Sequence, residues 1–162
     1  MKYILVILFS LTTFVGVPSF GADEADIKRL LETNECKDCD LTGADLKDSK
    51  LVKAKLQDAL LDHANLKEVD LTEANLEDAD LRYANLKRSN LTGANLEDAI
   101  LQGTNLKGAN LTGANIRGTF FLGAKLQNAN FKGALLYAND FQRIKTGAIL
   151  CNTTMPDGQV EN

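Results

Sequence analysis

The stretch EANLEDADLRYANL (73–86) contains the pattern that decides the fold. Leucine returns at every fifth position, and alanine stands two positions before each of these leucines. From Leu41 to Leu136 all twenty positions of the series hold Leu, Ile or Phe, and seventeen hold Leu. The preceding small position is Ala in fourteen of the twenty repeats. The pattern therefore extends over residues 39 to 136 of a chain of 162 residues.

Neither a helix nor an ordinary strand can bury such a series. On an α-helix a step of five residues rotates the side chain by a net ~140°, so the leucines would scatter around the surface. In a strand the same step moves each leucine to the opposite face. A chain that turns by a right angle at every fifth residue directs all of them to one axis. Four such sides close a square coil of about twenty residues, and coils stack about 4.8 Å apart.

The outward positions show a second period, of twenty residues, that a five-residue repeat alone does not require. This period favours four sides per coil over three or five. It appears as a lysine column, an acidic column with two glutamates beside it, and a threonine column. The lysine column is Lys47, Lys67, Lys87 and Lys107; the acidic column is Asp58, Asp78 and Asp98, with Glu77 and Glu97; the threonine column is Thr72, Thr92 and Thr112.

The runs CDLTGADL (39–46), EANLEDADLRYANL (73–86) and LTGANLEDA (91–99) resemble the pentapeptide-repeat family, whose motif is A-(D/N)-L-X-X. The resemblance implies an all-β fold, a right-handed quadrilateral β-helix, here of about five coils over residues 39–141. It also implies a structural or protein-interaction role. The ending LCNTTMPDG (150–158) resembles that of some bacterial, often cyanobacterial, members.

Residues 1–21 have the composition of a cleavable secretory signal. Lys2 is the only charge before Asp23, and an apolar run of about fourteen residues follows it, too short to span a bilayer comfortably. Small residues stand three and one before a plausible cut after Gly21. We therefore expect export to a periplasm, a thylakoid lumen or the cell exterior, without stable membrane insertion after cleavage. An uncleaved membrane anchor is the alternative.

The two ends of the mature chain are expected to cap the coil. Residues 22–38 are expected to form a short helix and a C-x-x-C turn, because Ile27, Leu30 and Leu31 have helical spacing. Such a helix would cover the open first coil, as repeat proteins require. The five-residue pattern fails near Asn139, so residues 142–162 are expected to form an irregular C-terminal cap and tail.

The chain has three cysteines. In an exported protein, Cys36 and Cys39 are candidates for a local disulfide that joins the capping helix to the first coil. Two free thiols remain the alternative, and a redox centre is disfavoured because Cys39 falls in an inward small position. A zinc site needs about four ligands, but only His63 and Cys151 remain, and Cys151 lies about five coils away. No nucleophile elbow, phosphate loop or H-E-x-x-H motif is present, so we expect no enzyme, metal or cofactor.

Three surface features are candidate interaction sites. The lysine column would face anions, and the acidic column would bind divalent cations weakly; alternatively, both only keep a copied repeat soluble. A candidate partner surface consists of Ile100, Phe120 and Leu122, which point outward on one side of the square. Cover by the C-terminal tail, or no role at all, are its alternatives.

The net charge of −4 is unevenly distributed, with −8 over residues 22–100 and +3 over residues 101–162. We expect an exported interaction module with an unknown protein partner, either monomeric or weakly self-associating. Some members of the resembling family imitate DNA and bind topoisomerases, which gives the alternative of an acidic DNA mimic. The secretory signal and the lysine column oppose it, and no nucleic acid is expected as a partner.

Overall fold

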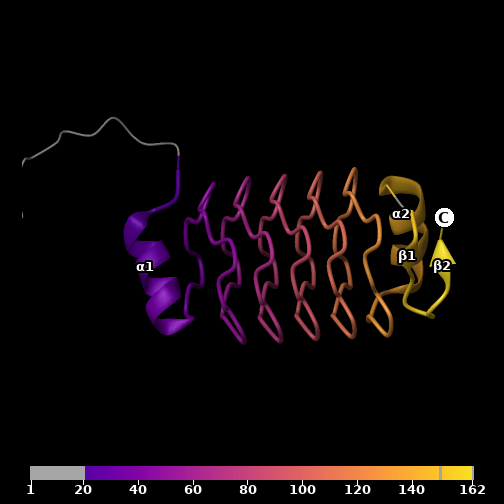
Figure 1. Ribbon diagram of the computed structural model, residues 1–162, viewed down its shortest axis with the longest axis horizontal. Coiled ribbons are helices and arrows are strands. Elements are labelled where there is room, and N and C mark those ends of the chain that lie inside the picture. Colours follow the sequence, from indigo (N-terminus) through magenta and orange to yellow (C-terminus); the bar gives the residue numbers. More distant parts are fainter. Residues whose placement is uncertain (1–20, 150, 162) are drawn as a thin grey trace, which may run out of the picture.

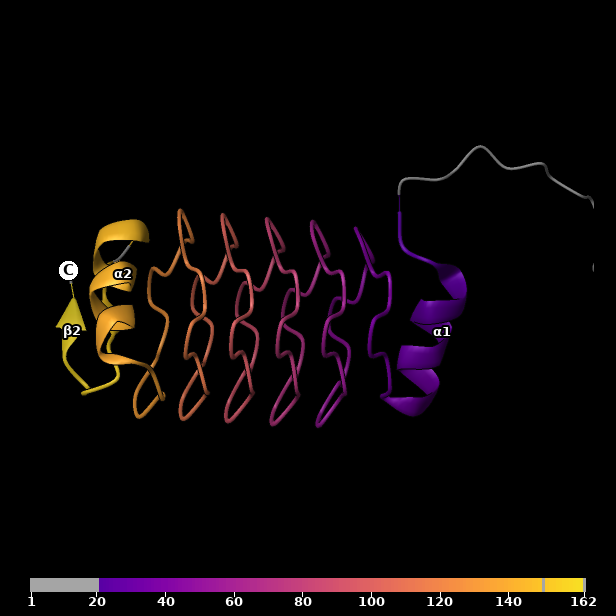
Figure 2. The same cartoon turned by 180° about the vertical axis from the view of Figure 1, so that it is seen from behind.

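The computed structural model describes residues 21–149 and 151–161. It is a rod in which coils of chain are stacked between two capping structures (Figures 1 and 2). Helix α1 (Glu24–Thr33) lies at one end. Helix α2 (Ala138–Gly147) and the hairpin of strands β1 (Thr153–Thr154) and β2 (Val160–Glu161) lie at the other. The expected secretory signal falls outside the described residues, except for Gly21.

The coils are joined by parallel β-bridges between residues twenty positions apart. One such series runs Glu35, Lys55, Asn75, Asn95, Asn115 and Leu135, which gives five steps along the rod. A bridge falls at every fifth residue, so each coil has four sides. The expected square coil is thus present. The expected all-β class holds only in part, because these rungs are isolated bridges, and β1 with β2 is the one sheet among the described residues.

The interior of the rod is filled by the central residue of each repeat. Leu91, for example, has no exposed surface, and Ala94 beside it is equally buried. Where the small position holds a buried hydroxyl, the hydroxyl donates to a backbone carbonyl, as Thr104 does to Leu81 at 2.7 Å. Burial of these polar groups is therefore compensated. Near the C-terminal end the rings of Phe121 and Phe131 pack edge to face, with centroids 5.8 Å apart.

Where Asn or Asp precedes the central residue of a repeat, it holds the corner of the coil. The Oδ1 of Asn75 accepts from the backbone N–H of Glu77 at 3.1 Å, which closes a short side-chain turn. The Nδ2 of Asn95, one coil further, donates to the same Oδ1 at 3.1 Å. Asn115 repeats this contact to Asn95 at 2.9 Å. The motif residue therefore links neighbouring coils as well as turning the chain.

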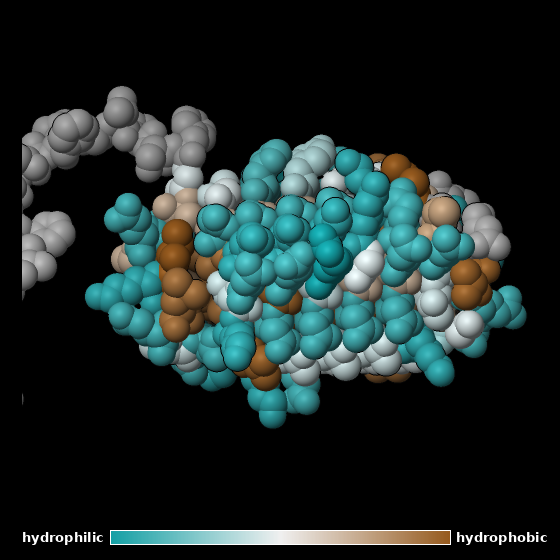
Figure 3. All heavy atoms as spheres, viewed as in Figure 1, coloured by the Kyte–Doolittle hydropathy of each residue, from teal (hydrophilic) through white to brown (hydrophobic). Residues whose placement is uncertain are grey.

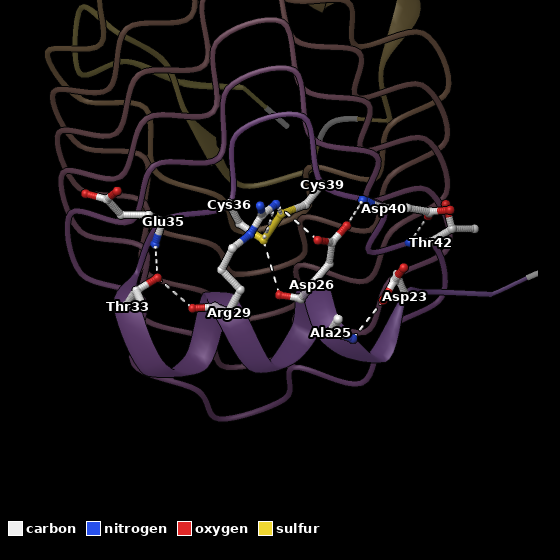
Figure 4. The surroundings of a disulfide bond; sticks show 10 residues. All are labelled: Asp23, Ala25, Asp26, Arg29, Thr33, Glu35, Cys36, Cys39, Asp40 and Thr42. Atoms are coloured by element: carbon white, nitrogen blue, oxygen red, sulfur yellow. Dashed lines mark hydrogen bonds and ion pairs between the residues drawn. A yellow bond between two sulfur atoms is a disulfide. The ribbon is translucent and has the colours of Figure 1, made fainter.

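Helix α1 covers the open first coil. Asp23 caps the helix by accepting from the N–H of Ala25 at 2.7 Å. The Oδ2 of Asp26 accepts from the N–H of Asp40 at 2.9 Å, so an otherwise open coil edge finds a partner on the helix (Figure 4). Leu30 is fully buried. Burial of a leucine of this kind stabilises a fold by about 1.5–3 kcal/mol.

The C-terminal end differs from the expected irregular cap. Helix α2 begins at Ala138, before the expected end of the coil at residue 141. After it the coil resumes, because Ile149 pairs with Lys125 and Thr154 with Asn130, at a separation of twenty-four residues instead of twenty. Buried Thr153 and Met155 then occupy a small and a central position of the repeat. The helix thus inserts four residues, and this change of phase hides the continued repeat in the sequence.

A buried carboxylate joins α2 to the last regular coil. In the coil below, the N–H of Asp98 donates to the carbonyl of Arg117 at 2.9 Å. The equivalent N–H, of Gly118, donates instead to the Oδ2 of Asp140 at 3.1 Å. The same oxygen accepts from the N–H of Tyr137 at 2.9 Å. In a regular coil this N–H would donate to a backbone carbonyl of the next coil, but α2 stands in place of that side. The carboxylate of Asp140 therefore acts as the acceptor instead of the carbonyl.

The leucine-filled axis can be tested by one truncation. Leu91→Ala is expected to lower the free energy of unfolding by about 2–5 kcal/mol, because a buried leucine leaves a cavity that the stacked coils close only in part. Chemical denaturation followed by circular dichroism measures the change. Lys107→Ala, an exposed position two positions beyond Asn105, is the control and should change stability by less than about 0.5 kcal/mol. Equal effects of the two substitutions would contradict the packed axis.

Candidate interaction surfaces

The four sides of the rod carry different outward side chains. We name them by the central residue of one coil: side A (Leu101), side B (Leu106), side C (Leu111) and side D (Ile116). Residues twenty positions before or after belong to the same side, because bridges stack them. Sides A and C are therefore opposite one another, and so are sides B and D.

The candidate partner surface lies on side A. Successive bridges place Ile100 between Asp80 and Phe120. Ile100 is 37% exposed and Leu122 is 51% exposed. Phe120 is only half-exposed, because the guanidinium carbon of Arg143 on α2 lies 5.7 Å from the centre of its ring. Cover by the C-terminal segment thus applies to Phe120, whereas Ile100 and Leu122 stay open.

Further apolar side chains are exposed near the C-terminal end, and the sequence pattern did not single them out. Tyr137 stacks near the guanidinium of Arg117, 5.9 Å from ring centre to carbon. In Figure 3 the coils are mainly hydrophilic on the visible face, and hydrophobic residues appear near α1 and near the C-terminal end. Ile149 and Val160 could not be placed from the sequence, because the repeat changes phase before them, whereas Leu135 and Tyr137 flank Leu136 and are still in phase. In addition to Leu122, the exposed set at this end is Leu135, Tyr137, Ile149 and Val160.

The lysine column lies on side B and is not uniform. Lys47 and Lys67 each pair with the acidic residue that follows, Asp48 at 3.2 Å and Glu68 at 3.5 Å. Lys87 and Lys107 have no ion pair within the described residues. The reason is visible in the repeat, since Arg88 and Gly108 follow them instead of an acid.

The acidic column and its two glutamates lie on side D. Asp58 pairs with Lys37 at 3.7 Å. Glu77 and Glu97 accept hydrogen bonds from the amides of the corner asparagines, Asn95 at 3.3 Å and Asn115 at 2.9 Å. Glu77, Glu97, Asp78 and Asp98 have no cationic partner among the described residues.

The acidic side does not assemble a cation site. Over residues 21–149 and 151–161, the group of three or more metal-ligand side chains close enough to share an ion is Asp26, Cys36 and Cys39. In the structure the two sulfur atoms of this group are bonded to each other. The Nη2 of Arg29 lies 2.6 Å from the Sγ of Cys39 and 3.1 Å from an oxygen of Asp26 (Figure 4). A cation already lies against this group, so it does not fit a bound metal.

The cysteine pair lies under α1, where the first coil begins. The Cα atoms of Cys36 and Cys39 are 5.2 Å apart, within the usual range for a disulfide, and both residues are fully buried. Arg29 of the helix contacts the pair, which ties the cap to the coil. Cys151 is a free and exposed thiol at the other end of the rod.

Some surface carboxylates have shifted acidities with local causes. A hydrogen bond from the hydroxyl of Thr72, at 2.6 Å, lowers the pKa of Asp70 from its ordinary value of 3.8. At Asp80, burial raises the pKa, but hydrogen bonds and the charge of Arg82 outweigh it, so the pKa is lowered. His63, on side A, stacks on Tyr83 with ring centroids 5.2 Å apart. These contacts stabilise the surface of the coil.

The model of the family described as pentapeptide repeats matches residues 39–78, 70–108 and 104–143. The chain belongs to the pentapeptide-repeat family. Its members form right-handed quadrilateral β-helices, and they are generally structural or interaction modules and not enzymes. The resemblance seen in the repeat motif is thereby confirmed.

Solved structures of the family resemble the chain. HetL, a protein involved in heterocyst differentiation regulation from the cyanobacterium Nostoc sp. strain PCC 7120, is 33% identical, with a TM-score of 0.54 over 78% of this chain and 66% of HetL. The pentapeptide repeat protein alr5209 from Nostoc PCC 7120 is 32% identical, with a TM-score of 0.55 over 66% of this chain and 84% of alr5209. A pentapeptide repeat protein of the Arabidopsis thaliana thylakoid lumen is 23% identical, with a TM-score of 0.49 over 78% of this chain and 84% of that one. No curated protein matches in sequence.

Neither α1 nor α2 has the length and apolar character needed to cross a bilayer.

The lowered pKa of Asp70 predicts a contribution to stability that depends on pH. The contribution is present at neutral pH and is lost as the pH falls below about 4 through the pKa of the folded protein. Asp70→Asn should reduce the acid-side loss of stability, because Asn already stands at the equivalent positions 90, 110 and 130. Melting temperatures measured between pH 7 and acidic pH provide the test. Thr72→Val, which removes the hydroxyl donor, should act in the same direction; unchanged pH profiles for both would contradict the assignment.

Proposed function

We propose that this chain is a non-enzymatic, exported interaction module that binds another protein through the apolar surface of side A. The observation that carries the proposal is the exposure of Ile100 and Leu122 on one side of the rod, next to the half-exposed Phe120. Exposed apolar clusters on soluble proteins mark contact sites more often than scattered single residues do. Members of the family act in protein interactions, which supports the same role here.

The backbone bridges of side A make this surface suitable for a rigid contact. Each outward residue is fixed by the bridges of its coil, so the surface undergoes little rearrangement on binding. A partner therefore orders few flexible groups, and this lowers the entropic cost of association. Arg143 above Phe120 places a cation at the edge of the surface, which favours a partner with an acidic residue beside its apolar contact.

Export of the chain is the second part of the proposal. It is supported by the signal-like composition of residues 1–21 and by the buried pair Cys36 and Cys39, whose bonded geometry suits an oxidising compartment. No observation favours the DNA-mimic alternative, because lysines occupy side B opposite the acidic side D. Divalent-cation binding along side D has no group of three close ligands among the described residues to support it.

A single substitution tests the partner surface. Ile100→Asp should keep the fold, because Asp80 already occupies the equivalent position one coil below. It should weaken capture of a crosslinked partner from the exported fraction by about tenfold, the loss of one apolar anchor. Leu60→Asp is the matched control, in the same column two coils away, and should leave capture unchanged. Equal capture by Ile100→Asp and wild type would remove side A from consideration.

Fractionation of the source cells tests export. The mature protein should lie outside the cytoplasm, begin near Ala22, and have an intact mass that rises by two hydrogens on reduction of Cys36 and Cys39. Cys36→Ser should abolish that mass change. A chain that remains cytoplasmic with residues 1–21 attached would contradict export and would leave the proposed partner surface untouched.

A further inference from the structure

We propose that copies of this chain associate side by side, with side B of one copy against side D of the next. This inference does not depend on the apolar surface of side A. It concerns the charged groups that the fold of a single copy leaves without partners.

Side B carries the first set. In the first coils the lysines of this side have acidic partners, Lys47 with Asp48 at 3.2 Å and Lys67 with Glu68 at 3.5 Å. Lys87 and Lys107 have none within the described residues, and side B carries no acidic residue from Asn85 to Asn128. The fold thus presents two cations in one column, one coil apart.

Side D carries the complementary set. Glu77, Asp78, Glu97 and Asp98 form two acidic pairs one coil apart, and none of the four forms an ion pair within the described residues. The contacts that Glu77 and Glu97 make with Asn95 and Asn115 are hydrogen bonds from neutral amides, so the negative charge is not compensated. The column ends at Arg117, one coil above Glu97.

The two sets match in spacing and in height. Both repeat at the distance between coils, about 4.8 Å. Lys87 follows Glu77 by ten residues and precedes Glu97 by ten, so it lies half a coil from each. Two parallel copies can therefore lie side by side without a shift along the axis. Lys87 of one copy then lies at a height between the Glu77 and Glu97 pairs of the other copy, and Lys107 lies just above the Glu97 pair. Because sides B and D are opposite, a copy that uses side B for one contact still has side D free for a contact with a third copy.

A second copy fits this surface better than a polyanion does. Side D of a second copy offers carboxylates at the same coil spacing as the lysines, a period that a polyanion with a different charge spacing does not share. Side C offers no equivalent contact, because its threonine hydroxyls are already used. Thr92, for example, donates to Asn90 at 2.7 Å and accepts from Asn110 at 2.9 Å.

The expected association is weak, open-ended and sensitive to salt. Five coil spacings give a contact only ~24 Å long, smaller than a standard protein interface. Exposed ion pairs contribute little each and are screened by salt. A contact between two different sides does not close on itself, so it forms rows of copies and not a defined dimer.

Sedimentation velocity of the full chain at high concentration tests the proposal. Between about 0.01 M and about 1 M salt the Debye length falls from ~30 Å to ~3 Å, so species larger than the monomer should be present at low salt and disappear at high salt. A side B variant, Lys87→Gln with Lys107→Gln, and a side D variant, with Glu77→Gln, Asp78→Asn, Glu97→Gln and Asp98→Asn, should each be monomeric at low salt. Gln and Asn already occur at equivalent repeat positions, at Gln57, Gln127 and Asn128, so both variants should fold.

A mixture of the two variants gives the sharpest result. The intact side D of one variant meets the intact side B of the other, and no further contact is possible, so the mixture should form species of two copies and none larger. Lys132→Glu and Lys132→Gln are the controls, because Lys132 lies on side C, which takes no part in the contact. Both should associate to the same extent, whatever the charge introduced. The proposal is overturned if the wild type is monomeric at low salt, if either variant still associates like wild type, or if the mixture forms longer rows.

Discussion

The structure depends on one constraint, which is that every fifth side chain must reach the same axis. The stacked leucines meet it only if the chain turns at each repeat, and where Asn or Asp precedes the central residue its side chain closes the turn by accepting from the N–H two residues on. The same corner amide then bonds the coil below, as Asn95 does to Asn75. Burial of the leucine and bonding of the corner are thus two consequences of one five-residue geometry.

This coupling explains which parts of the fold could be predicted. The period of five and the columns at twenty are properties of the sequence itself, so the four-sided coil follows from them. Helix α2 does not, because its four additional residues shift the phase, and Thr153 and Met155 then fall in register only if a helix is already assumed. The role of Asp140 is likewise invisible, since its carboxylate replaces a carbonyl that only the folded coil defines.

The surface is predictable to a different extent. The columns themselves could be read from the sequence, and the position of Ile100 on side A follows from the period. The sequence does not show which of these charged residues form ion pairs. Lys47 and Lys107 stand at equivalent positions, but one pairs with Asp48 and the other has no anion within the described residues. Phe120 shows the same limit, because its cover by Arg143 comes from the helix that the pattern did not reveal.

A filled axis confines function to the exterior, and the repeat limits what the exterior can do. Each coil repeats the side of the coil below at a fixed height, so any group placed on a side becomes part of a column. Columns suit long, flat contacts with a matching period, and a second copy of the same rod has that period by construction. A foreign partner does not share it, so recognition of such a partner depends on positions where the column is broken. Ile100 above Asp80 is such a position, and it lies where side A approaches α2. Self-association and partner binding therefore draw on opposite properties of the surface, regularity on sides B and D and irregularity on side A.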